Sequence, residues 1–161
     1  MAERSTASAY VLAAVGIALG VGISRVSEMI EAIVLIVLVP LTGIGYSNPL
    51  PVLWCTQAVF DALSGATAGA FLRKGLARVG RRRPFRSDLP LVIGSALLWS
   101  VLGLVGNQAV NLHSYPVWLT VTARYWAPAT AMLVVAAAAV LRAAHAPRGA
   151  QSALQEEGPK P

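Results

Sequence analysis

Apolar residues in this chain come in long, uninterrupted runs, and the polar residues gather between them. Runs of this length, without strict alternation of apolar and polar positions, are typical of membrane-spanning helices rather than of a soluble core. Five runs are expected to form transmembrane helices, at about residues 7–24, 27–46, 52–72, 89–112 and 117–141. The pattern therefore predicts an all-α integral membrane protein, a bundle of about five transmembrane helices forming one domain over residues 1–146.

The boundary between the first two runs is marked by charge. Arg25 ends the first run, and Glu28 and Glu31 open the second. Three residues apart, the two carboxylates share one helical face. We expect either a charged turn at the membrane interface, paired with Arg25 or with the basic loop, or the start of a proton or cation pathway. Pro40 removes a backbone hydrogen bond and is expected to kink the second helix.

Small residues recur at a spacing that allows helices to approach closely. Gly16 and Gly20 form one GxxxG motif in the first run, and Gly65 and Gly69 form another in the third. Small residues four apart lie on one helical face and let a neighbouring backbone come near. Both motifs predict tight helix packing.

A basic loop over residues 73–88 sets the predicted orientation. It holds seven of the 13 Lys and Arg residues of the chain, namely Arg73, Lys74, Arg78, Arg81, Arg82, Arg83 and Arg86. Cytoplasmic loops carry such an excess of cations. With five spans, the C-terminus is then cytoplasmic and the N-terminus lies outside. We expect the loop to contact anionic lipid or an acidic partner, and residues 147–161 to form a polar, flexible tail.

Composition narrows the classes of function. The chain is 56% hydrophobic and 12% charged, with a net charge of +6. Its cations stand beside apolar runs rather than on a folded face, which argues against nucleic-acid binding. The expected location is the cytoplasmic membrane of a prokaryote. Cys55 is the one cysteine, so no intramolecular disulfide forms, and we expect it to be a small buried apolar residue. His113 and His145 have no further ligands at suitable spacing, so no metal or cofactor is expected.

Two ionisable residues fall inside predicted spans, and such residues are costly unless they are paired or hydrated. Asp61 and Arg124 are both expected about 10–14 Å deep in the outer half of the membrane, at a rise of about 1.5 Å per residue. The predicted polar cluster in this half comprises Gln57, Asp61, Asn107, Asn111, Arg124 and Tyr125. We expect Asp61 and Arg124 either to pair and hold two helices together, or to line an outward-facing pocket for a small solute or lipid headgroup, or to contact a partner chain.

These features favour a transport-related or small-solute-binding membrane subunit. The alternative is a non-catalytic subunit or assembly factor of a larger membrane complex, working with other subunits or as a homo-oligomer. A lipid-modifying enzyme is the third hypothesis. Catalysis has less support. The chain has two aspartates, Asp61 and Asp88, which are expected far apart, and no serine–histidine or cysteine–histidine pair is expected at the same depth in the membrane.

Overall fold

The computed structural model of the chain describes residues 2–33, 36–37, 39–42, 50–79, 89–113 and 122–145. The elements within these ranges are α1 (Ala2–Ile33), α2 (Val39–Thr42), α3 (Leu50–Arg78), α4 (Leu89–His113), the π-helical turn η3 (Thr122–Trp126) and α6 (Ala127–His145). All of them are helical. The all-α class predicted from the sequence is confirmed for this part of the chain.

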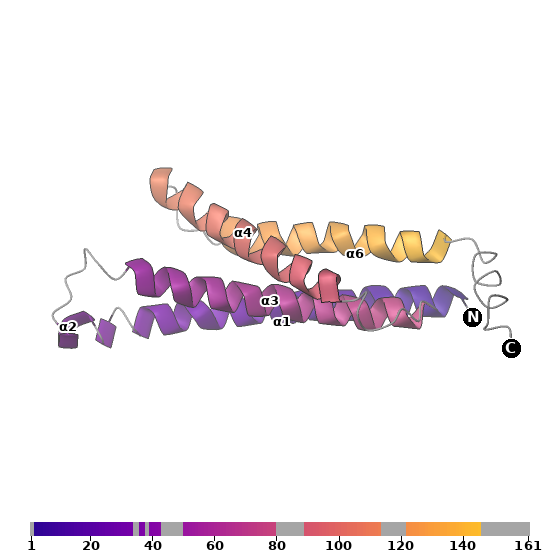
Figure 1. The fold of residues 1–161 in the computed structure, drawn as a ribbon, viewed down its shortest axis with the longest axis horizontal. Coiled ribbons are helices and arrows are strands. Elements are labelled where there is room, and N and C mark those ends of the chain that lie inside the picture. The colour runs from indigo at the N-terminus through magenta and orange to yellow at the C-terminus, as the bar shows by residue number, and fades with distance from the viewer. Residues whose placement is uncertain are drawn as a thin grey trace, which may run out of the picture.

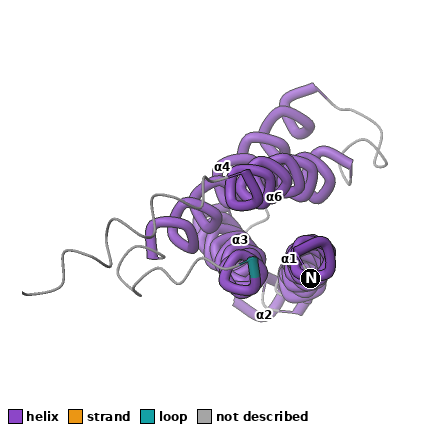
Figure 2. The backbone as a smooth tube through the Cα atoms, turned by 90° about the vertical axis from the view of Figure 1, so that its right-hand side faces the viewer, coloured by secondary structure: helices purple, strands orange, loops and turns teal. Residues whose placement is uncertain are grey.

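Four long helices, α1, α3, α4 and α6, make up the fold. α1 and α3 lie side by side and antiparallel along the longest axis, while α4 crosses them obliquely (Figure 1). Seen along that axis, α4 and α6 lie together on one side of the α1–α3 pair (Figure 2). The most extensive contacts join α1 to α3 and α3 to α4, so α3 is the central helix.

Glycine faces explain how closely these helices approach. A methyl group on Gly20 of α1 would lie 2.9 Å from the carbonyl oxygen of Ser64 on α3. One on Gly69 of α3 would lie 3.1 Å from the Cα atom of Val92 on α4. Since real side chains do not fit at such distances, both GxxxG motifs mark helix interfaces, and the predicted tight packing is confirmed.

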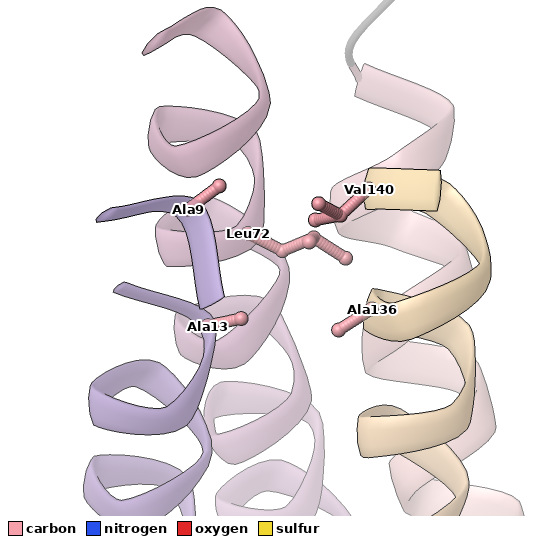
Figure 3. Packing of buried hydrophobic residues seen from close by; sticks show 5 residues of the cluster. All are labelled: Ala9, Ala13, Leu72, Ala136 and Val140. Carbon is pink, nitrogen blue, oxygen red and sulfur yellow. The ribbon is translucent and has the colours of Figure 1, made fainter. Parts of the chain in front are cut away.

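The apolar core is layered along the bundle. The first layer joins α1, α3 and α6 and consists of Ala9, Ala13, Leu72, Ala136 and Val140 (Figure 3). The second layer takes residues from all four long helices and consists of Ile17, Ala68, Trp99, Ala129 and Met132. Beyond this second layer, in the direction of the end of α1, buried polar residues replace the apolar ones.

The predicted boundary at Arg25 is wrong. α1 runs through it without interruption from Ala2 to Ile33, and therefore includes the first part of the expected span at 27–46. The reason is local: Arg25 Nη1 lies 2.9 Å from Glu28 Oε2, so the charged turn neutralises itself within one helix. Four long helices thus replace the five predicted spans in the described ranges.

The sequence placed the N-terminus and the basic loop at opposite ends, whereas the described helices bring the start of α1 to the basic residues of α3. The start of α1 lies beside the end of α3, where Arg78 Nη1 donates a hydrogen bond of 2.8 Å to Ser8 Oγ. The start of α1 and the end of α6 lie at the same end of the bundle (Figure 1). We call this the basic end, because Arg73, Lys74 and Arg78 stand there on α3. Merging the first two spans reversed the direction expected for α1.

Three helical stretches are long and apolar enough to cross a membrane, counted over the described residues: Thr6–Ile33, Leu89–Gly106 and Arg124–His145. They suggest an integral membrane protein. α3 has 29 residues, but Gln57 and Asp61 in its middle lower its hydropathy. Residues 43–49, the loop cations Arg81, Arg82, Arg83 and Arg86, and the tail at 147–161 lie outside the described residues.

Candidate functional site

A group of buried and half-buried polar side chains lies between the helices in the half of the bundle away from the basic end. We call it the polar cluster. Its members are Ser24, Ser27, Glu28 and Glu31 of α1, Gln57, Asp61 and Ser64 of α3, Trp99 of α4, and Arg124 and Tyr125 of η3. In a bundle whose outward side chains are largely apolar, buried polar groups are the exception that calls for a physical reason.

Asp61 lies at the centre of the polar cluster and is 1% exposed. Ser24 Oγ donates a hydrogen bond of 3.1 Å to its Oδ1 atom. The other oxygen, Oδ2, is buried and has no hydrogen-bond partner among the described residues. It faces α4, where a methyl group on Gly103 would lie 2.6 Å away. A side chain at this position would force the carboxyl group to shift.

Ser24 connects three helices. Its hydroxyl lies 2.9 Å from Ser64 Oγ on α3 and accepts a hydrogen bond of 3.2 Å from Trp99 Nε1 on α4. Ser64 also donates to the carbonyl of Phe60, one turn earlier, at 2.8 Å. Ser24 and Trp99 were not among the predicted site residues. One sequence feature could have indicated Ser24: it shares a helical face with Ser27 or Glu28, and with Glu31.

Arg124 is held by the carboxylates of α1. Its Nη2 atom lies 3.0 Å from Glu31 Oε1, and its Nη1 atom lies 3.8 Å from Glu28 Oε1. Ser27 also donates to Glu31, at 2.8 Å. The Nε atom of Arg124 is buried without a hydrogen-bond partner in the described part of the chain.

The predicted ion pair between Asp61 and Arg124 is therefore replaced. Both side chains are described, and no salt bridge joins them, because Arg124 turns to Glu28 and Glu31 instead. The uninterrupted α1 carries those two glutamates past Arg25 and into the same half of the bundle as Arg124. Of the two roles expected for the glutamates, the pairing of Glu28 with Arg25 is present, and both also pair with Arg124.

The charged side chains become progressively less exposed from the surface of the bundle toward Asp61. The side chain of Arg25 is 52% exposed, that of Glu28 32%, that of Glu31 17% and that of Arg124 8%. Arg25 also stacks on the ring of Tyr125, with its Cζ atom 4.5 Å from the ring centroid. These side chains form a continuous charged path from the outside of the bundle into the polar cluster.

The remaining predicted site residues fall in different places. Gln57 is buried one turn from Asp61, and Tyr125 is buried under Arg25. The side chains of Asn107 and Asn111 lie outside the described residues. Cys55 is exposed, so the expectation that it is buried is wrong. Within the described ranges no three His, Cys, Asp or Glu side chains come together as metal ligands.

The fold and the polar cluster define a class: a small, all-helical protein with three helices long and apolar enough to cross a membrane and a charged cluster buried between them. No protein-family model matches the chain, and no curated protein or solved structure matches it.

Proposed function

We propose that all four long helices cross a membrane, α3 included. Large apolar side chains point outward on each of them, among them Val15, Leu19 and Met29 on α1, Val59 and Leu63 on α3, Leu97 and Val101 on α4, and Leu133 and Val134 on α6. The buried positions, in contrast, include two charged residues, Asp61 and Arg124. A bundle with an apolar surface and a partly polar interior suits lipid better than water. The neighbouring helices cover the polar side chains of α3, Gln57 and Asp61, so that this helix can also cross the membrane.

The proposed orientation puts the basic end, and with it both termini, in the cytoplasm. The segments that connect helices at the opposite end, residues 34–49 and 114–121, contain no Lys or Arg. The segment 79–88 after α3 contains four Arg residues. This asymmetry follows the positive-inside rule. Arg73, Lys74 and Arg78 then lie where anionic headgroups attract cations, at about 1 kcal/mol each.

The function supported best is binding of a small polar solute in the polar cluster, as part of transport. The observation that carries it is that Asp61 Oδ2 and Arg124 Nε are both buried in the polar cluster without a hydrogen-bond partner among the described residues. Each such atom costs about 1–3 kcal/mol of stability. A solute with a donor and an acceptor would satisfy both, and the charged path past Glu28 gives it a way in.

Thermal unfolding in mild detergent tests this role. The purified chain is mixed in turn with amino acids, small sugars, monovalent cations and simple anions. A bound solute at about 100 times its Kd stabilises the protein by about 2.7 kcal/mol and raises its Tm accordingly. Asp61→Leu, which removes the acceptor oxygen, should abolish the rise, whereas Val59→Ala, at an outward position on the same helix, should retain it.

Two results would contradict solute binding. One is a Tm unchanged by every compound tested. The other is a shift that Asp61→Leu and Val59→Ala retain equally, which would place the solute elsewhere. A second chain that purifies in fixed proportion, together with an unchanged Tm, would favour a subunit role in a larger complex.

A further inference from the structure

Four close polar contacts around Asp61 can be compared with the hydrogens available to make them. Ser24 Oγ contacts Asp61 Oδ1 at 3.1 Å, Ser64 Oγ at 2.9 Å and Trp99 Nε1 at 3.2 Å. Ser64 Oγ also contacts the carbonyl oxygen of Phe60 at 2.8 Å. All four distances are in the range of hydrogen bonds. Each of these bonds needs a hydrogen of its own.

For these four contacts, the side chains other than Asp61 supply three hydrogens. A serine hydroxyl has one, and an indole nitrogen has one. Ser24, Ser64 and Trp99 together therefore satisfy three of the four contacts. A carboxylate at position 61 has no hydrogen to add. In one of the four contacts, two oxygen atoms would then face each other without a hydrogen between them.

A proton on Asp61 Oδ1 completes the set. With that proton in place, the Ser24–Asp61 contact, in which a carboxylate would accept from Ser24, reverses its direction, and the acid donates to Ser24. Ser24 then donates to Ser64, and Ser64 donates to the Phe60 carbonyl. Trp99 donates to the second lone pair of Ser24. Every hydrogen and every contact is used once, because a hydroxyl oxygen accepts two hydrogen bonds and donates one.

The charges around Asp61 agree with a neutral acid. The charged groups that act on it from other elements are Glu31 of α1 and Arg124 of η3. Arg124 is already in salt bridges with Glu31 and Glu28. α4 brings Trp99 and Gly103 against Asp61 and no titratable side chain from its described residues. An ionised Asp61 would therefore have no cation in contact, which is costly between membrane helices.

The unpartnered oxygen is explained in the same way. In a neutral acid protonated on Oδ1, Oδ2 is a carbonyl oxygen, and leaving it without a donor costs less than leaving a carboxylate oxygen without one.

We propose that Asp61 is a proton-binding site, whose carboxyl group carries a proton at neutral pH in the protein without solute. The proposal goes beyond solute binding, because the hydrogen count does not involve a solute. It gives the buried acid a role of its own: a titratable group that accepts or releases one proton within the membrane.

Infrared spectroscopy of the purified protein at neutral pH tests this directly. The C=O stretch of a protonated carboxyl group absorbs separately from the bands of a carboxylate. We expect the wild-type spectrum to contain this band, Asp61→Asn to lack it, and Val59→Ala, at an outward position on the same helix, to retain it. Identical spectra of wild type and Asp61→Asn in this region would overturn the proposal.

Thermal stability gives a second readout from the same proteins. Asparagine has the shape of the neutral acid and can donate to Ser24, so Asp61→Asn should change Tm by less than about 3 °C. Asp61→Leu, of similar size but without a donor, should lower Tm clearly further. If Asp61→Asn destabilises as much as Asp61→Leu, the group is needed as a charge, and the proposal fails.

Discussion

Replacing Glu31 with glutamine is expected to lower the free energy of unfolding by about 3 kcal/mol, the lower end of the cost of breaking a buried ion pair. The change leaves the guanidinium of Arg124, whose side chain is 8% exposed, without the carboxylate that lies 3.0 Å from it. Glu28 remains at 3.8 Å and offsets part of the loss. Unfolding by sodium dodecyl sulfate in mixed micelles measures the difference.

Glu28→Gln is the matched control for Glu31→Gln. Glu28 is more exposed than Glu31 and lies farther from Arg124, so its loss should cost less than about 1 kcal/mol. The double variant Glu31→Gln with Arg124→Gln should recover much of the stability, because no charge is then left unpaired. Equal costs for the two glutamates, or rescue of Arg124→Asp by Asp61→Arg, would contradict the pairing described here.

A valine at position 65 is expected to separate α3 from α4 and to cost about 3 kcal/mol, the upper part of the range for overpacking. Even the Cβ atom of alanine at this position would lie 2.7 Å from the Cα atom of Ala96 and 2.7 Å from the Cβ atom of Trp99. Backbone and a fully buried indole cannot move aside cheaply. The same detergent unfolding assay measures the loss.

Gly22 and Gly94 provide controls for this packing. A methyl group at either position meets nothing within 4 Å, and alanine is the better helix former. Gly22→Ala and Gly94→Ala should therefore leave stability unchanged or raise it slightly. A comparable loss at Gly22 and Gly65 would mean that the helix faces are assigned incorrectly.

The apolar runs were sufficient to predict the helical class, and the spacing of small residues was sufficient to predict the helix interfaces. Each of these features can be read from the residues of a single helix. The boundary predicted between the first two spans was wrong. Arg25 looks like the end of a span when it is considered alone, but its pairing with Glu28 keeps the charge within α1. The start of α1 therefore lies beside the end of α3, at the basic end.

The candidate site was predicted in part for the same reason. Asp61 and Arg124 stood out because an ionisable residue in an apolar run is conspicuous in any sequence. Their partners depended on which helix faces meet. The path of α1 decides that Glu31 reaches Arg124 and that Ser24 reaches Asp61. Serine and tryptophan are ordinary in membrane helices, so the roles of Ser24 and Trp99 become visible only from the contacts between helices.

The central claim is that α1 and α3 are aligned so that Ser24 and Ser64 meet beside Asp61, and a disulfide tests it most directly. The Oγ atoms of the two serines are 2.9 Å apart, so cysteines there are within reach of a bond after small adjustments. In a Cys55→Ser background, Ser24→Cys with Ser64→Cys should form an intramolecular disulfide under mild oxidation, detected as lost thiol labelling that dithiothreitol restores. Ser24→Cys with Leu63→Cys, on the outward face, should not. If the first pair keeps both thiols free, α1 and α3 are not aligned in this way, and the contacts described around Asp61 are contradicted.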